Sequence, residues 1–182
     1  WLAENNLPDA WPLSDMEVRS TRVPHMSIPR TKVNDAPPEQ MNDAWIADHC
    51  IRRIENRPKE KPFFICCGFN GPHPPFKIPE PYFAMYNPDD VPEPLNFLPE
   101  KDKPASKENS FYRQLWRDNG DSWASWRKSV AVYWGFCSFI DHQVGRLVEC
   151  LKQEQAYEDT LVIYCSDHGE MLGQHGLWHK MQ

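Results

Sequence analysis

The sequence has no apolar run long enough to cross a bilayer, no surplus of basic residues and no C-x-x-C cysteine pair. A transmembrane helix needs about 20 predominantly apolar residues, so we predict no membrane span in this sequence. The net charge of -6 argues against a general nucleic-acid-binding surface, because such a surface clusters Lys and Arg to displace counterions. The missing cysteine pairs exclude a zinc finger or zinc ribbon.

Cysteine itself is present at six positions: Cys50, Cys66, Cys67, Cys137, Cys150 and Cys165. Four of these fall in stretches that we predict to be core strand or the apolar face of a helix. A thiol in such a place behaves as a small hydrophobe. We therefore favour structural burial over disulfides or redox chemistry.

Proline is abundant, with 18 residues, and hydrophobic residues make up 40% of the 182-residue chain. This apolar content is too high for a disordered chain, and the length suits one domain or part of a larger one. Because proline fixes φ and removes a backbone donor, we expect long ordered loops. Residues 1–38 carry prolines without sustained periodicity, which predicts an irregular arm lying on the body formed by residues 39–182.

Two helices and two strands are predicted in that body. Apolar residues recur at helical spacing over residues 37–57 and again over 126–154. Continuous apolar runs at 63–67 and 160–165 are typical of strands covered on both faces. Two strands joined through a crossover helix imply parallel pairing in one sheet. The predicted fold class is therefore α/β with a mostly parallel sheet.

The connection between the first strand and the second helix, residues 68–125, is rich in loop-forming residues. So long a connection in a compact domain is more often functional than idle. Its part from 79 to 125 could form a wall facing a substrate, and a solvated packing loop is an equal alternative.

Both predicted strands lead into loops that carry chemically capable side chains. His73 lies among prolines after the first strand, and Asp167, His168, His175 and Lys180 follow the second. In open α/β sheets, ligands bind beyond the carboxyl ends of the strands. If the strands are parallel, both loops lie at the same edge, and we predict that His73, Asp167 and Lys180 converge on one pocket.

The Asp-His pair supplies a carboxylate oxygen and an imidazole nitrogen, which are suitable metal ligands. Capping of the following turn by Asp167, with His168 as an ordinary loop histidine, is an equal alternative. Taken singly, His73 is typical of a rigid connector and Lys180 of a surface lysine. Together, Asp167 and His168 would bind a metal, and His73 and Lys180 would add two cationic or hydrogen-bond-donating groups. A site of this kind suits a tetrahedral oxyanion such as sulfate or phosphate.

Three stretches resemble the sulfatase family. Residues 61–65 and 71–76 resemble its K-P-F-F…P-H-x-P-F segment, residues 141–147 its D-x-x-V-G-R-L helix, and residues 166–180 its S-D-H-G…L-G-x-H-G-x-W-x-K segment. Order and spacing agree from about residue 39 to residue 180, and the likeness is strongest to iduronate-2-sulfatase-like and choline-sulfatase-like members.

The resemblance implies an alkaline-phosphatase-like α/β/α sandwich that hydrolyses a sulfate ester of a sugar or small alcohol. By the same resemblance, Asp167 and His168 would be ligands of a Ca²⁺ ion. Lys180 would hold a sulfate oxygen, and His73 would contact the sulfate or the leaving-group oxygen. His175 would be a further substrate contact.

The family's nucleophile is a formylglycine made from the Cys or Ser of a C/S-x-P/A-x-R motif, and the sequence contains no such motif. We therefore expect an internal fragment of a larger sulfatase, inactive alone, with the nucleophile upstream. The alternatives are a phosphonate monoester or phosphodiester hydrolase of the same superfamily and a noncatalytic relative that binds sulfated glycans. An exported location, whether periplasmic, extracellular or lysosomal, follows from the resemblance only.

Overall fold

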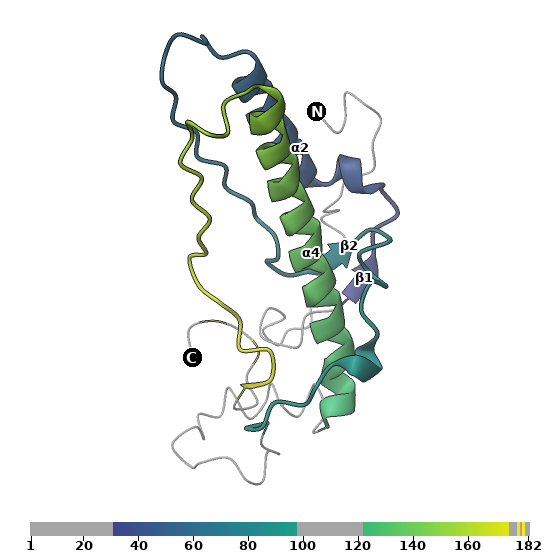
Figure 1. Ribbon diagram of the computed structural model, residues 1–182. Coiled ribbons are helices and arrows are strands. Elements are labelled where there is room, and N and C mark those ends of the chain that lie inside the picture. The colour runs from purple at the N-terminus through teal and green to yellow at the C-terminus, as the bar shows by residue number, and fades with distance from the viewer. Residues whose placement is uncertain (1–30, 98–121, 175–177, 179, 181–182) are drawn as a thin grey trace, which may run out of the picture.

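The computed structural model describes residues 31–97 and 122–174, together with Trp178 and Lys180. Its largest elements are the helices α2 (Asn42–Glu55) and α4 (Trp123–Gln153), which pack against each other (Figure 1). No helix in the described part of the chain is long and apolar enough to cross a membrane.

Both predicted helices are present, with shifted ends. The first was predicted from residue 37, but Pro38–Gln40 forms a short 3₁₀ turn and Met41 is extended, so α2 begins at Asn42. Two successive prolines explain the delay, because a proline restricts the residue before it and removes a backbone donor. The second helix begins at Trp123, slightly before the predicted residue 126.

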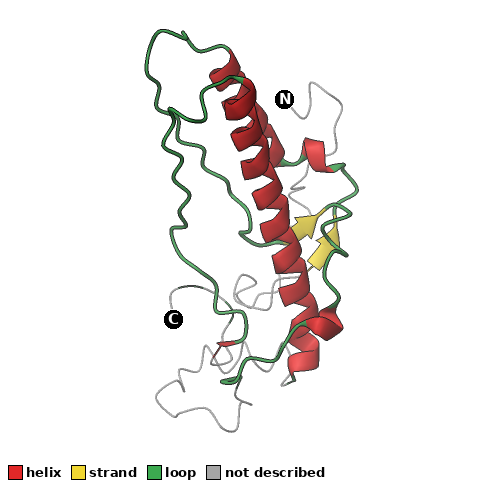
Figure 2. Cartoon of the chain, in the orientation of Figure 1, coloured by secondary structure: helices red, strands yellow, loops and turns green. Residues whose placement is uncertain are grey.

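The predicted strands at 63–67 and 160–165 are extended but do not form a sheet within the described residues. Both run as loops in Figure 2. A strand requires a hydrogen-bonded neighbour, and the described residues supply none beside either segment. The prediction of extended backbone therefore agrees with the structure, whereas the prediction that these two segments pair in one sheet does not.

The observed sheet is small and lies elsewhere. β1 (Thr31–Val33) pairs in parallel with β2 (Phe76–Ile78), with Thr31 opposite Phe76. We had predicted an irregular arm and a loop at these positions. Phe76 and Ile78 are fully buried, so packing against α4 decides their conformation despite the surrounding prolines. Of the predicted arm, residues 1–30 lie outside the described part of the chain.

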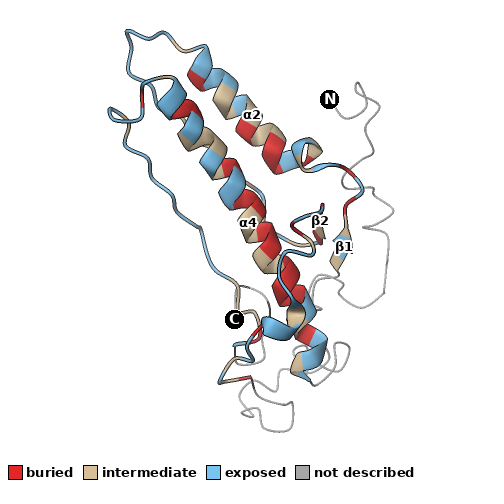
Figure 3. Cartoon of the chain, turned by 45° about the vertical axis from the view of Figure 1, so that its right-hand side comes forward, coloured by how far each residue is buried: buried red, intermediate tan, exposed pale blue. Residues whose placement is uncertain are grey.

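The main core lies between α4 and β2, and Figure 3 shows the buried side of α4 turned toward the two strands. Its buried side chains are Met41, Ala44, Phe76, Ile78, Tyr82, Val91, Phe97, Trp126, Val130, Ala131, Val132, Phe136, Phe139, Ile140 and Trp178. By contrast, Phe64, Leu161 and Ile163 on the extended segments are 91%, 85% and 76% exposed. The first segment is therefore half-buried on one face, through Ile65 and Cys67, whereas residues 161–169 of the second segment are exposed on both faces.

The cysteines of the helices are also buried or half-buried, whereas two of the three on the extended segments are exposed. Cys150 is buried, but Cys66 and Cys165 are exposed, so the prediction of structural burial is wrong for these two. Both belong to the extended segments, and their exposure follows from the uncovered faces of those segments.

The first extended segment runs along α4 from its C-terminal end toward its middle. Ile65 packs against a cluster that contains Cys150 and Leu151. Six residues further on, Gly71 lies so close to Phe136 and Ile140 that a Cβ atom would come within 2.5 Å of the Phe136 ring. The segment is thus antiparallel to α4.

The second extended segment takes the same course. It starts beyond the end of α4, where the Thr160 hydroxyl donates to the carbonyl oxygen of Ala156 at 2.6 Å. Its continuation brings Glu170 near enough to Tyr133, in the middle of α4, for the carboxylate to raise the pKa of that phenol. The two segments therefore run in the same direction, and their carboxyl ends lie at similar levels along α4.

Candidate functional site

The turn that carries His73 is held by the start of α2. Asp43, in the first turn of that helix, is buried, and its Oδ1 accepts the N–H groups of Asn70 at 2.7 Å and Gly71 at 3.1 Å. Burial raises the pKa of Asp43, and these hydrogen bonds oppose the rise. The chain then closes a turn in which the His73 N–H donates to the Asn70 carbonyl at 3.1 Å. His73 therefore lies at the end of a hydrogen-bonded turn that Asp43 anchors to α2.

The His73 ring is exposed to solvent. Its Nδ1 lies 2.8 Å from the carbonyl oxygen of Pro74, which can only accept, so Nδ1 carries the proton in this contact. That assignment leaves Nε2 as the nitrogen that faces a reaction partner.

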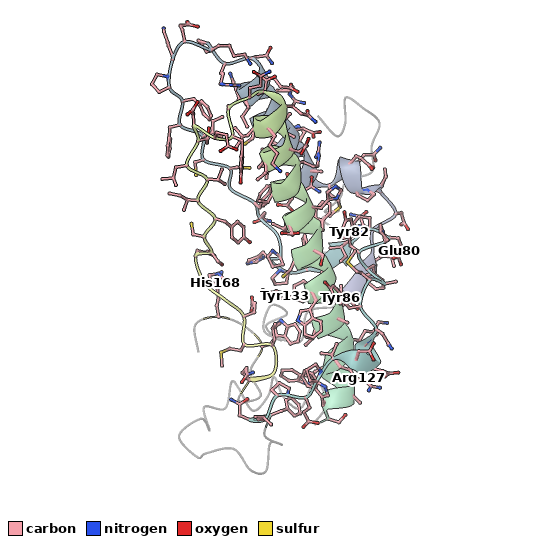
Figure 4. All side chains as sticks on the ribbon, viewed as in Figure 1. Glu80, Tyr82, Tyr86, Arg127, Tyr133 and His168 are labelled. Atoms are coloured by element: carbon pink, nitrogen blue, oxygen red, sulfur yellow. The ribbon has the colours of Figure 1, made fainter. Side chains whose placement is uncertain are left out.

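Asp167 and His168 form a local pair at the end of the second segment; Figure 4 shows His168 on this segment, to the left of α4. Asp167 Oδ1 accepts the N–H of the adjacent His168 at 3.0 Å, whereas a capping side chain would accept an N–H two or three residues further along. Its Oδ2 lies 3.4 Å from His168 Nε2, and Nδ1 of the same ring bonds to the carbonyl oxygen of Gly169 at 2.9 Å. One oxygen and one nitrogen therefore remain next to each other.

Two atoms at this separation can serve as neighbouring ligands of one divalent cation. Within the described residues no group of three or more His, Cys, Asp and Glu side chains could hold a metal. The pair therefore fits a metal site as two of its ligands, and the remaining ligands would come from outside the described residues.

Lys180 is positioned by its neighbour Trp178, which is buried in the main core. The Trp178 ring lies 6.0 Å from Phe76 and 5.8 Å from Trp126, measured between centroids. Its carbonyl accepts the N–H of Met171 at 3.0 Å. The half-buried Lys180 is thus tied to the loop that begins at the Asp-His pair.

The Glu170 carboxyl interacts electrostatically with three of the predicted site residues. Burial raises the pKa of its carboxyl, whereas the charges of His168, Lys180 and His73 lower it in that order. One carboxylate oxygen, Oε2, is buried without a hydrogen-bond partner in the described part of the chain. The structure therefore brings residues from both extended segments into electrostatic contact around one carboxylate.

Sequence reasoning missed three residues of this region: Glu170, Asp43 and Tyr133. Asp43 had a weak indication, as an acidic residue in the first turn of a predicted helix. Tyr133 was predicted only as part of the apolar face of a helix, yet burial and the nearby Cys137 and Glu170 raise its pKa, which keeps it a neutral phenol. The predicted substrate contact His175 lies outside the described residues.

Comparison with known proteins gives a consistent result. The family model described as Sulfatase matches residues 5–182. An arylsulfatase of Clostridium perfringens is 30% identical over 139 residues, which are 75% of this chain and 28% of that protein. Human iduronate 2-sulfatase is 28% identical over 162 residues, which are 81% of this chain and 29% of that protein.

Among solved structures, the phosphonate monoester hydrolase SpPMH from Silicibacter pomeroyi superposes with a TM-score of 0.67 at 26% identity, covering 93% of this chain and 37% of that one. The chain thus spans roughly a third or less of the proteins it matches. The superposition supports the predicted alkaline-phosphatase-like α/β fold, and the family match extends over nearly every residue. The chain belongs to the sulfatase family.

Proposed function

We propose that the protein is a metal-dependent sulfuric ester hydrolase and that this chain supplies one side of its active site. The observation that carries the proposal is the oxygen and nitrogen pair of Asp167 Oδ2 and His168 Nε2, 3.4 Å apart, and it is supported by the electrostatic influence of His168, Lys180 and His73 on Glu170. Cationic and donor groups gathered in this way suit a substrate with several anionic oxygens.

Each residue has a proposed role. Asp167 Oδ2 and His168 Nε2 would hold the cation, which would supply positive charge to neutralise the sulfuryl oxygens. The resemblance implies Ca²⁺, although the imidazole nitrogen also suits Mn²⁺ or Zn²⁺. The Lys180 ammonium binds a sulfate oxygen, and Nε2 of His73 delivers a proton to the departing alcohol oxygen.

The nucleophile is expected to be a formylglycine, which no motif of this sequence provides. The proposal therefore concerns the binding of substrate and metal by this chain and the protonation of the leaving group.

A second candidate is hydrolysis of phosphonate monoesters or phosphodiesters. It is favoured by the superposition on a phosphonate monoester hydrolase and by 30% identity, over 166 residues, to a multifunctional alkaline phosphatase superfamily protein of Trinickia caryophylli. The same cation and lysine would serve either oxyanion. Turnover of p-nitrophenyl sulfate and of p-nitrophenyl phenylphosphonate, measured side by side, separates the two.

The decisive test is Asp167→Ala, with Asp159→Ala as the control. Both aspartates are exposed, but Asp159 lies at the opposite end of the extended segment. Calorimetric titration of the purified protein with Ca²⁺ and Mn²⁺ should show binding lost in Asp167→Ala alone. In the full-length protein, sulfate ester turnover should fall about 100-fold to 1,000-fold, the usual effect of removing one preorganised electrostatic group.

Equal metal binding and turnover in the two variants would leave Asp167 with a local structural role. Metal binding without turnover of either ester by a full-length protein that carries the formylglycine motif would favour the noncatalytic, glycan-binding alternative.

A further inference from the structure

Three cysteines lie where α2 meets the first extended segment, away from the candidate active site. Cys50 is on α2, and Cys66 and Cys67 belong to the segment. After burial, the neighbouring Cys50 is the next cause of the raised pKa of the Cys67 thiol, so the two side chains lie close together. Both of these residues are half-buried, whereas Cys66 is exposed.

Contacts on either side of the cysteines fix how the segment lies on α2. At the start of the helix, the Asp43 carboxylate accepts the N–H of Asn70 at 2.7 Å. Near its end, Ile54 belongs to the cluster against which Ile65 packs. The segment therefore runs antiparallel to α2 and is held to it at both ends.

Simple geometry then places the two thiols at the same level. From Asp43 to Cys50 a helix advances about 10 Å, at about 1.5 Å per residue. From Asn70 back to Cys67 an extended chain also covers about 10 Å, at about 3.3 Å per residue. The packing of the two backbones therefore places Cys50 and Cys67 opposite each other.

The neighbouring cysteine points the other way. Successive side chains of an extended chain alternate between opposite faces. Ile65 and Cys67 are half-buried toward the helices, whereas Phe64 and Cys66 are exposed on the far side. Cys66 is therefore a control that the sequence itself provides.

We propose that Cys50 and Cys67 are a disulfide-forming pair that fastens α2 to the segment leading into the His73 turn. The oxidant is a small-molecule disulfide, RSSR. Cys50 attacks one of its sulfurs, which forms a mixed disulfide and releases the first RSH. Cys67 then attacks the Cys50 sulfur, which forms the intramolecular S–S bond and releases the second RSH. Two thiols are oxidised, and one disulfide is reduced to two thiols.

The surroundings of Cys67 make this a lasting bridge rather than a rapid switch. Burial, and next the contact with Cys50, raise the pKa of the Cys67 thiol to about 12. A thiol with so high a pKa is a poor leaving group, so an external thiol that attacks the Cys50 sulfur displaces Cys67 slowly. The same property makes the closing step slow, and formation of the bridge requires prolonged oxidation.

The test is disulfide mapping of the purified protein after incubation with oxidised glutathione and alkylation of the remaining thiols. Trypsin leaves Cys50 in the peptide 33–52 and places both Cys66 and Cys67 in the peptide 60–77, because the Lys61-Pro62 bond resists cleavage. The unaltered protein and Cys66→Ser should both give the cross-linked pair of peptides. Cys67→Ser and Cys50→Ser should lose it.

A cross-link that disappears in Cys66→Ser would overturn the proposal, as would complete alkylation of Cys50 and Cys67 after prolonged oxidation of the unaltered protein. If either of the other variants fails to fold, the Cys66→Ser protein alone decides, because its 60–77 peptide contains Cys67 as the only thiol. The mapping needs no activity measurement, so its result is independent of the proposed hydrolase function.

Discussion

Replacement of Asp43 tests whether its carboxylate holds the His73 turn through its acceptor oxygen or through its negative charge. Its Oδ1 accepts the N–H groups of Asn70 at 2.7 Å and Gly71 at 3.1 Å, while its own burial disfavours the charge. Asp43→Asn keeps an acceptor oxygen and removes the charge. Asp43→Ala removes both.

The expected magnitudes follow from those contacts. A hydrogen bond to a charged group contributes about 1.5 to 3 kcal/mol, and Asn70 is exposed, so water replaces part of the loss. We expect Asp43→Ala to lower the free energy of unfolding by about 2 to 4 kcal/mol, as the sum of two such bonds after that discount. For Asp43→Asn we expect a change within about 1 kcal/mol, because weaker hydrogen bonds and relief of the buried charge offset each other.

The pH dependence gives a second readout with a definite sign. The folded-state pKa of Asp43 is raised above its ordinary value of 3.8, so the folded protein binds the proton more tightly than the unfolded chain. The stabilisation from this group is complete below pH 3.8 and is lost as the pH rises through the folded pKa. Relative to the unaltered protein, Asp43→Asn should therefore gain stability across that window and level off above it.

Urea unfolding of the three proteins at several pH values measures both effects. Equal losses for Asp43→Asn and Asp43→Ala would refute the reasoning, because they would show that the charge, and not the acceptor oxygen, holds the turn. A difference between the unaltered protein and Asp43→Asn that does not change with pH would refute the assignment of the raised pKa.

Two further predictions concern packing. Gly135→Ala should lower the free energy of unfolding by about 3 kcal/mol or more, because its Cβ would lie 2.0 Å from the carbonyl oxygen of Tyr82. Gly145→Ala, whose Cβ would have nothing within 4 Å, should instead stabilise α4 by about 0.5 to 1 kcal/mol. Thermal unfolding compares the two variants, and similar midpoints would contradict the first prediction. Trp178→Ala should cost about 3 to 5 kcal/mol through the cavity it leaves. Trp178→Phe should cost less, because it also removes the buried indole N–H that has no partner among the described residues; equal losses of stability in urea would contradict this.

The helices could be predicted from the sequence because their pattern is local. Apolar residues at helical spacing identify α2 and α4 without knowledge of any neighbour. The extended segments were recognisable from their apolar runs, but pairing depends on a partner strand that no local pattern reveals. β2 shows the opposite failure, since Phe76 and Ile78 stand among prolines and become a strand only because α4 buries them.

In the candidate site, too, residues marked by a local pattern were predicted, and a residue that depends on contacts between distant segments was missed. His73, Asp167, His168 and Lys180 were found because they follow apolar runs, and ligands gather beyond such runs. Glu170 was missed because its importance depends on three charges that approach from two segments far apart in the sequence. No spacing rule within one segment contains that information.

The common level of the two loops is a consequence of α4. This helix runs from Trp123 to Gln153, and the cluster around Cys150 and Leu151 near its C-terminal end receives the start of the first segment. The second segment begins just beyond the same end. Each segment then covers a similar distance back along α4, so the His73 turn and the Asp167-His168 pair lie near the middle of the helix. No backbone hydrogen bonds pair the two segments as strands within the described residues. Packing against α4 therefore accounts for the position of the His73 turn, which Gly71 brings close to Phe136 and Ile140. Residues 161–169 of the second segment are exposed, and that segment returns to the core at Leu172.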